Sequence, residues 1–235
     1  MPARRSRPRR AAPTYGWRRA PARKENPENR PARGLRVAAG AARPAVARAE
    51  AVRIVAGEFG GRPLAAPRDN RIRPTSDRTR EAVFNVLAHG YDGLPRGARV
   101  LDLFAGTGAL GLEAVSRGAA QCLFIEESAE GRALIRDNVE ALGLQGRTKI
   151  FRRDATRLGS AGTIAPFDLL FADPPYGKAF GERALAAARD GGWLKAGAVC
   201  VVEESAAAPF AAVAGFLLED ERAYGDTVMR FFRFA

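Results

Sequence analysis

Histidine and cysteine are scarce in this chain, which holds one histidine and two cysteines among 235 residues. Zinc sites and disulfide frameworks are built mainly from these two residue types, so the sequence predicts neither. Cys122 and Cys200 lie in apolar runs and are expected to be buried free thiols. His89 stands alone near a predicted helix end, and we therefore expect no bound metal.

Long hydrophobic runs are also missing. The longest weakly polar run, 206–218, is too short and too rich in alanine to span a bilayer. The N-terminus has no apolar core segment of the kind found in secretory signals. The sequence therefore predicts a cytoplasmic protein without a membrane partner. With 46% hydrophobic residues, the chain can still bury a core, and we expect a monomer.

Acidic residues are nearly absent from the front of the chain. Residues 1–50 hold 14 Arg and Lys against 3 Asp and Glu, whereas residues 81–235 hold 17 against 20. The net charge of +12 therefore belongs to the N-terminal part, which favours a polyanionic partner, most simply nucleic acid. Large apolar residues are rare in residues 1–50, and seven prolines interrupt any helix, so this stretch is predicted to be a disordered basic tail. An RNA-binding arm, a start assigned upstream of the true one and a transit peptide are three open origins for it.

Residues 51–90 are predicted to form a small β-hairpin, an arginine-rich segment and a helix, ahead of a main domain at 91–235. The segment 68–80 contains five arginines and few apolar residues, and guanidinium groups bind phosphates with two hydrogen bonds at once. The candidates for RNA contact are Arg71, Arg73, Arg78 and Arg80. A solvated basic loop, or pairing with Asp77 and Glu81, remains the alternative.

Strands alternate with helices along the main domain. Apolar runs at 99–104, 121–125, 148–151, 167–172 and 198–202 predict strands, and 216–220 with 227–234 predict a terminal hairpin. This order indicates an α/β, Rossmann-like fold with a mainly parallel seven-stranded sheet, helices on both faces and an antiparallel C-terminal hairpin.

A glycine-rich loop follows the first of these strands. Gly106 and Gly108 let the backbone pass close to a ligand, and the following helix offers free N–H groups at its N-terminus. With Gly111 they match a dinucleotide fingerprint, which alone would support NAD. The pattern is weak, because many α/β proteins contain it.

Acidic residues at strand ends favour S-adenosylmethionine instead of NAD. Asp102 and Phe104 precede the glycines as Asp-x-Phe-x-Gly-x-Gly, and Asp154 suits the adenine amine. Glu126 can accept from both ribose hydroxyls, but it lies twenty residues after Gly106 and so also belongs to the NAD pattern. Each has a structural alternative: Asp102 can cap the N–H groups of the glycine loop, Asp154 can begin a turn, and Glu127 can replace Glu126 as the ribose ligand.

The fourth strand ends in Asp173-Pro174-Pro175-Tyr176. Two consecutive prolines have no N–H to donate, so the backbone must leave the sheet at Asp173 in a stiff turn. The Asp173 carboxylate and the Pro174 carbonyl form an acceptor pair suited to an exocyclic amine, and the Tyr176 ring is a stacking surface for a base. An ordinary turn after a strand is the alternative for the motif alone.

Together, the 102–114 segment and the 173–176 turn resemble the amino-group methyltransferases of the Rossmann-like type. The segments 53–64 and 73–85 narrow this resemblance to the bacterial family that methylates the N2 amine of one guanine in 16S ribosomal RNA. The resemblance covers the chain from about Val52 onward, and residues 1–50 have no counterpart in the family. It implies S-adenosylmethionine as methyl donor and the small ribosomal subunit as partner. It also implies that Thr75 and Asn85 cover the cofactor or present the RNA.

Three other functions remain to be distinguished. A DNA adenine-N6 or cytosine-N4 methyltransferase would share the 173–176 turn, but it usually carries a larger target-recognition region than this chain has room for. A non-catalytic RNA-binding protein in ribosome assembly would not need the intact turn. An NAD oxidoreductase would bind NAD in place of S-adenosylhomocysteine.

Overall fold

The computed structural model describes residues 52–67 and 76–235. The predicted basic tail lies outside the described residues, and so do Arg71, Arg73 and Thr75. No helix in the described part of the chain is long and apolar enough to reach across a bilayer.

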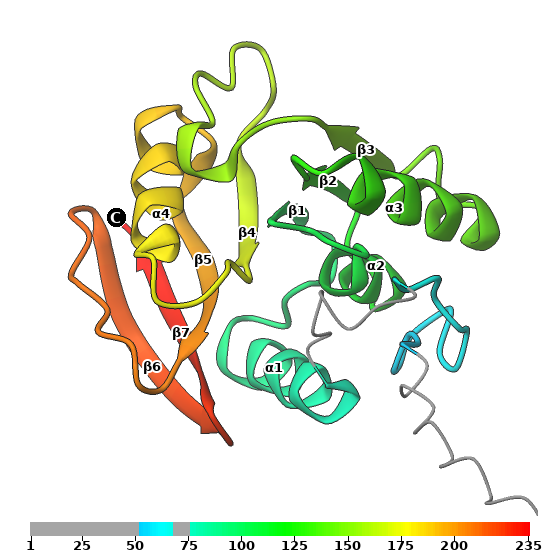
Figure 1. The fold of residues 1–235 in the computed structure, drawn as a ribbon, viewed down its shortest axis with the longest axis horizontal. Helices are drawn as coiled ribbons and strands as arrows, with labels where there is room; N and C mark the ends of the chain where they lie inside the picture. Colours follow the sequence, from blue (N-terminus) through cyan, green and yellow to red (C-terminus); the bar gives the residue numbers. More distant parts are fainter. Residues whose placement is uncertain (1–51, 68–75) are drawn as a thin grey trace, which may run out of the picture. The chain divides into compact units, whose positions relative to one another are not determined.

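Seven strands form one sheet in the order β3-β2-β1-β4-β5-β7-β6 (Figure 1). The strands are β1 (Arg99–Leu103), β2 (Gln121–Ile125), β3 (Thr148–Phe151), β4 (Phe167–Ala172), β5 (Leu194–Ser205), β6 (Phe216–Tyr224) and β7 (Thr227–Phe234). The first five pair in parallel, and β7 pairs antiparallel with both β5 and β6. The predicted fold class is confirmed, although β5 and β6 extend beyond the apolar runs that predicted them.

The order of the strands reverses at β1. The chain builds outward from β1 to β2 and β3, and then returns to place β4 on the other side of β1. Crossover helices leave the sheet in opposite directions at such a point, which opens a crevice at the carboxyl ends of the two central strands. The topology therefore places a binding site where β1 and β4 end.

Helices cover both faces of the sheet. They are α1 (Asp77–Gly90), α2 (Ala109–Ser116), α3 (Ala129–Leu142) and α4 (Phe180–Asp190), with the short 3-10 helix η1 (Ala155–Arg157). One apolar core lies between the sheet and α1, α2 and α3, and a second lies between the sheet and α4 with η1 (Figure 1). Neighbouring strand residues alternate between these cores, as Phe171 and Leu170 do, because side chains alternate across a sheet. Both faces of the central strands β1, β2 and β4 are buried, which is why these strands are largely apolar.

Two helices begin at a serine whose side chain caps the first turn. The Ser76 hydroxyl accepts from the Thr79 N–H at 3.1 Å, and the Ser128 hydroxyl accepts from the Gly131 N–H at 2.9 Å. Each satisfies an N–H that the first helical turn leaves without a helical partner. Gly143 ends α3 in the left-handed conformation that glycine adopts most readily.

The N-terminal segment 52–67 is attached to the main domain through buried side chains. Its predicted hairpin forms with a single bridge between Arg53 and Pro63. The Glu113 carboxylate on α2 accepts from the N–H groups of Val55 and Ala56 at 2.6 and 3.0 Å. Asn138 on α3 holds Ala65 and also donates to the Thr107 carbonyl in the glycine loop. The segment is thus linked to the two helices that flank the glycine loop.

Candidate active site

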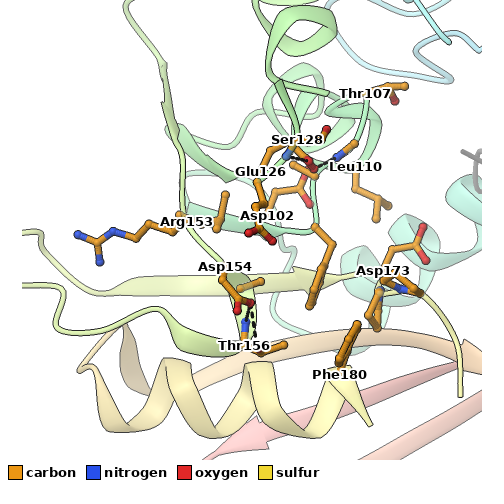
Figure 2. Close-up of a pocket in the computed structure, with 18 of the residues that line it drawn as sticks. Asp102, Thr107, Leu110, Glu126, Ser128, Arg153, Asp154, Thr156, Asp173 and Phe180 are labelled. Carbon is orange, nitrogen blue, oxygen red and sulfur yellow. Dashed lines mark hydrogen bonds between the residues drawn. The ribbon is translucent and has the colours of Figure 1, made fainter. Parts of the chain in front are cut away.

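A cavity of about 880 Å³ lies at the carboxyl ends of the central strands. Figure 2 shows Asp102, Glu126, Asp154 and Asp173 around it, each from a different strand end or the residues that follow. The structure therefore brings together four acidic residues that are separated by up to 71 positions in the sequence. Pro174, Pro175, Tyr176, Phe104 and Gly106 also line this cavity.

Asp102 is a buried residue of β1 that is hydrogen-bonded to the start of α2, directly after the glycine loop. Its Oδ2 accepts from the Gly111 N–H at 2.9 Å, which is the capping role weighed for it from the sequence. Burial raises its pKa to about 8, the Gly111 hydrogen bond opposes that rise, and the charge of Glu126 adds to it. Asp102 therefore carries its proton through most of the neutral range.

The glycine loop adopts backbone conformations that most residues avoid. Gly106 and Gly108 have φ of +55° and +78°, and Phe104 has φ of +57° although it carries a side chain. The Phe104 ring lies parallel to Phe180, with 6.3 Å between centroids. Gly108 does not line the cavity: a Cβ there would approach the side chains of Ile135 and Phe124 at 3.3 Å. It shapes the turn, while Gly106 borders the open space.

Glu126 is held in place by two backbone groups. One carboxylate oxygen accepts from the Gly106 N–H and the other from the Ser128 N–H, each at 2.8 Å. These bonds join the end of β2 to the glycine loop. The side chain is oriented before any ligand arrives, as a ribose-binding carboxylate would need.

Asp154 both begins a turn and faces the cavity. Its Oδ1 accepts from the Thr156 hydroxyl at 2.7 Å and from the Thr156 N–H at 2.8 Å, which caps η1 (Figure 2). Slight burial raises its pKa, but the two Thr156 hydrogen bonds, with smaller help from Arg157 and Arg183, outweigh burial and lower the pKa overall. Asp154 is therefore a charged acceptor on the cavity wall.

The 173–176 turn leaves the sheet where the prolines require it. The last pair between β4 and β5 is Ala172 with Val202, and Asp173 follows at once. The Tyr176 hydroxyl donates to Glu203 at 2.6 Å, and the Gly177 N–H donates to Glu204 at 3.0 Å.

Glu203 and Glu204 were not predicted as site residues, because the fifth strand was expected to end at Val202. A pair of carboxylates directly after a strand was the signal available for them. Phe180, Thr156 and Arg183 also line the cavity without having been predicted as site residues.

Two of the arginines predicted to contact RNA, Arg78 and Arg80, lie in the described part of the chain, and their surroundings differ. Arg78 is exposed on α1, in keeping with phosphate contact. Arg80 is fully buried: its Nη2 donates to the Arg53 carbonyl at 2.6 Å and to Asp77 at 2.5 Å. Burial lowers the pKa of Arg80, and Asp77 opposes that change. The expectation that Arg80 holds RNA phosphates is therefore wrong, because its guanidinium anchors α1 to the hairpin. Asn85 is exposed on α1 and does not line the cavity.

Comparison with known proteins places this geometry in a family. The family model described as Conserved hypothetical protein 95 matches residues 52–233. The Ribosomal RNA small subunit methyltransferase D of Escherichia coli strain K12 is 36% identical over 77% of this chain and 89% of its own length. The protein of the same name from Haemophilus influenzae is 30% identical over 77% and 93%.

Solved structures agree with these relatives. A structure assigned as the methyltransferase yhhF of E. coli superposes with a TM-score of 0.67 at 32% identity, covering 78% of this chain and 97% of that one. A hypothetical protein of a Thermus species superposes with a TM-score of 0.60 at 28% identity, covering 77% and 98%. The chain therefore belongs to the Conserved hypothetical protein 95 family, together with relatives named Ribosomal RNA small subunit methyltransferase D, and is an S-adenosylmethionine-dependent methyltransferase.

Proposed function

We propose that this chain transfers a methyl group from S-adenosylmethionine to the exocyclic N2 amine of a specific guanine in 16S ribosomal RNA of the small ribosomal subunit. The observation that carries this proposal is the position of the Asp173 turn, on the same cavity as Glu126 and Asp154. The names of the relatives from E. coli and H. influenzae support ribosomal RNA as the substrate. The choice of guanine N2 is supported by the family resemblance of the arginine-rich segment and of the turn.

The cavity suits the proposed cofactor in its charge. Six carboxylates line it against two arginines, and a negative cavity attracts a cationic sulfonium. The carboxylates are Asp102, Glu126, Glu127, Glu130, Asp154 and Asp173, and the arginines are Arg153 and Arg183. Asp102 contributes little of this charge near neutral pH, because its pKa is about 8.

Three residues would hold the cofactor. Glu126 would accept from the ribose hydroxyls, Asp154 would accept from the adenine amine, and Phe104 supplies apolar surface beside Phe180. When bound, S-adenosylmethionine supplies a sulfonium methyl group that is already activated for transfer. The protein therefore has to align the two reactants, and alignment alone lowers a barrier substantially.

The guanine amine is a poor nucleophile because its lone pair is delocalised into the ring. Asp173 and the Pro174 carbonyl would each accept one N–H of the amine, which turns the nitrogen lone pair toward the methyl donor. Tyr176 would stack on the base, which must first leave its helix or loop. The N–C bond would form as the S–C bond breaks and S-adenosylhomocysteine leaves, and Asp173 would accept the proton that the nitrogen loses.

A methyl-transfer assay with labelled S-adenosylmethionine tests this proposal. Small subunits from cells that lack the enzyme, naked 16S ribosomal RNA and duplex DNA are offered in parallel, and the products are digested to nucleosides. Label in N2-methylguanosine from the subunit or its RNA is expected. Label in N6-methyladenine or N4-methylcytosine from DNA would instead make the chain a DNA methyltransferase. Tight binding of S-adenosylhomocysteine with no transfer to any substrate would favour a non-catalytic assembly protein.

A further inference from the structure

Beside the 173–176 turn, β4 no longer pairs with the edge of β5. Pairing of β4 with β5 ends at Ala172 and Val202, whereas β5 continues to Ser205 with β7 on its other side. Pro174 and Pro175 cannot restore the ladder, because proline has no N–H to donate. Another set of contacts must therefore hold the turn against β5.

Two adjacent carboxylates of β5 supply those contacts. Glu204 accepts from the N–H of Gly177, which follows the prolines, at 3.0 Å. Glu203 accepts from the Tyr176 hydroxyl at 2.6 Å. Both glutamates are nearly inaccessible to solvent, at 5% and 1% for Glu203 and Glu204. A hydrogen bond to a buried carboxylate is charge-assisted and shielded from water, which makes it one of the stronger contacts available to a phenol.

The two contacts act on different parts of the turn. Glu204 holds backbone, which the prolines already stiffen. Glu203 holds the far end of the Tyr176 side chain, and a ring anchored at its Cβ and at its hydroxyl has a fixed long axis. Tyr176 lines the cavity and Glu203 does not, so Glu203 affects the cavity through the ring.

We propose that Glu203 is a positioning residue for methyl transfer: by fixing the long axis of the Tyr176 side chain, it fixes the place of the ring on which the target base stacks. This inference rests on the proposed function, because only a planar substrate stacked on Tyr176 would register the ring orientation. Small errors of alignment at a reacting nitrogen reduce the rate of transfer strongly. The contact between Glu203 and Tyr176 should therefore affect the transfer step more than cofactor binding.

A double-mutant cycle on single-turnover methyl transfer to the small subunit measures this coupling. Tyr176→Phe and Glu203→Ala are each expected to slow transfer about tenfold, the order of one lost charge-assisted hydrogen bond. The double variant should be no slower than the slower single variant, within about twofold. Glu203→Gln retains an acceptor oxygen and should recover most of the rate. Affinity for S-adenosylhomocysteine should stay within about twofold throughout, which a merely structural role would not predict.

Glu113→Gln is the matched control for loss of a buried carboxylate. Glu113 holds Val55, Ala56 and Arg117, all of which lie outside the turn. Its effect should multiply with that of Tyr176→Phe. An equally multiplicative effect of Glu203→Ala would overturn the inference, as would a Glu203→Ala protein that loses stability or cofactor affinity at an unchanged transfer rate.

A readout independent of catalysis separates this inference from the proposed function. The chain has four tyrosines, so fluorotyrosine labelling gives few fluorine resonances, and Tyr176→Phe identifies the resonance of residue 176 by its loss. Glu203→Ala should move that resonance, whereas Glu113→Gln should leave it in place. An unmoved resonance refutes the positioning role even in an active enzyme. A wild-type protein that methylates no RNA refutes the proposed function, and the resonance still decides whether Glu203 fixes the ring.

Discussion

At the scale of single residues, the acidic side chains around the cavity differ in charge state because their surroundings differ. Asp102 is desolvated and has one N–H donor, so its pKa rises to about 8. Asp154 is partly exposed and accepts two hydrogen bonds from Thr156, so its pKa falls. The same residue type thus provides a neutral support under the glycine loop and a charged acceptor on the cavity wall.

The raised pKa of Asp102 predicts a pH-dependent stability. Between its unfolded value of 3.8 and about 8 in the folded protein, the native state binds one proton more than the unfolded state. The free energy of unfolding should therefore fall as pH rises from about 5 to about 8, by up to about 1.4 kcal/mol per pH unit from this group. Urea unfolding of the cofactor-free protein across that range measures the slope.

Asp102→Asn separates this group from all others that titrate. An asparagine oxygen can still accept from the Gly111 N–H, but it binds no proton, so the variant should show a flatter dependence of stability on pH. It should be more stable than wild type at about pH 8 and closer to it at about pH 5. Equal slopes in the two proteins would contradict the assignment.

Sequence reasoning reached the acidic residues but not all of their partners. Asp102, Glu126 and Asp154 stand at strand ends, and parallel strands bring their carboxyl ends to one edge, so their convergence followed from the order of strands and helices. Glu203 could not be assigned in the same way, because its partner Tyr176 lies 27 positions earlier and the register of β4 on β5 decides the contact. Arg80 was assigned wrongly for the opposite reason: its basic neighbours predicted an exposed phosphate ligand, whereas the side chain is fully buried and donates to Asp77 and to the Arg53 carbonyl.

At the scale of elements, α1 carries one exposed arginine, Arg78, and one fully buried arginine, Arg80. Arg80→Ala should lower stability by about 1.5–3 kcal/mol, because the change leaves Asp77 and the Arg53 carbonyl without their buried donor. Arg78→Ala should leave stability within about 0.5 kcal/mol, because the residue is exposed. Chemical unfolding of both variants tests this contrast.

The same pair reports on RNA contact. If Arg78 meets a phosphate, Arg78→Ala weakens binding to the small subunit and reduces the slope of log affinity against log salt by about 1. An unchanged salt slope would remove Arg78 from the interface. If Arg80→Ala keeps full stability but reduces the slope of log affinity against log salt, Arg80 contacts RNA phosphate after all.

The glycine loop predicts a packing effect at its third glycine. A Cβ at Gly111 would lie 2.4 Å from the Phe124 ring and 2.5 Å from the Cys122 sulfur, so α2 could not stay at its present distance from β2. Gly111→Ala should cost about 1–3 kcal/mol of stability, the usual range for overpacking. Gly146→Ala, where a Cβ meets nothing within 4 Å, is the matched control and should stay within about 0.5 kcal/mol. Equal stabilities of the two variants would contradict the packing argument.

Element lengths were less predictable than element types. Helix ends such as Ser76, Ser128 and Gly143 have local signals, because a capping serine or a left-handed glycine acts within one helical turn. β5 and β6 continue through charged residues because β7 pairs with both of them along their length. That pairing is made between segments distant in sequence, and no local pattern reports it.

At the scale of the whole molecule, the basic charge and the catalytic fold belong to different parts of the chain. The family model begins at residue 52, whereas residues 1–50 carry 14 of the 38 Arg and Lys. A protein that starts at Val52 should therefore keep its melting temperature and its affinity for S-adenosylhomocysteine. Its rate of methyl transfer to the small subunit should stay within about threefold at physiological salt, because local rather than remote contacts align the reactants.

The salt dependence of this shortened protein distinguishes the origins of the tail. An RNA-binding arm predicts a loss of subunit affinity of more than about tenfold with a shallower salt slope, since each phosphate contact releases counterions. A misassigned start predicts no change in either quantity.

The monomeric state also remains a prediction at this scale. Leu217 and Leu218, on the edge strand β6, are the exposed large apolar residues of the described chain.

The most direct test of the central claim follows the methyl group to its product in one turnover. Wild-type protein and Asp173→Ala are each mixed with labelled S-adenosylmethionine and small subunits that lack the modification, and the labelled nucleoside is identified by mass spectrometry. We expect N2-methylguanosine from wild type and at least about a hundredfold slower formation by Asp173→Ala, with unchanged affinity for S-adenosylhomocysteine. A different methylated nucleoside, or undiminished transfer by Asp173→Ala, would contradict the proposed function.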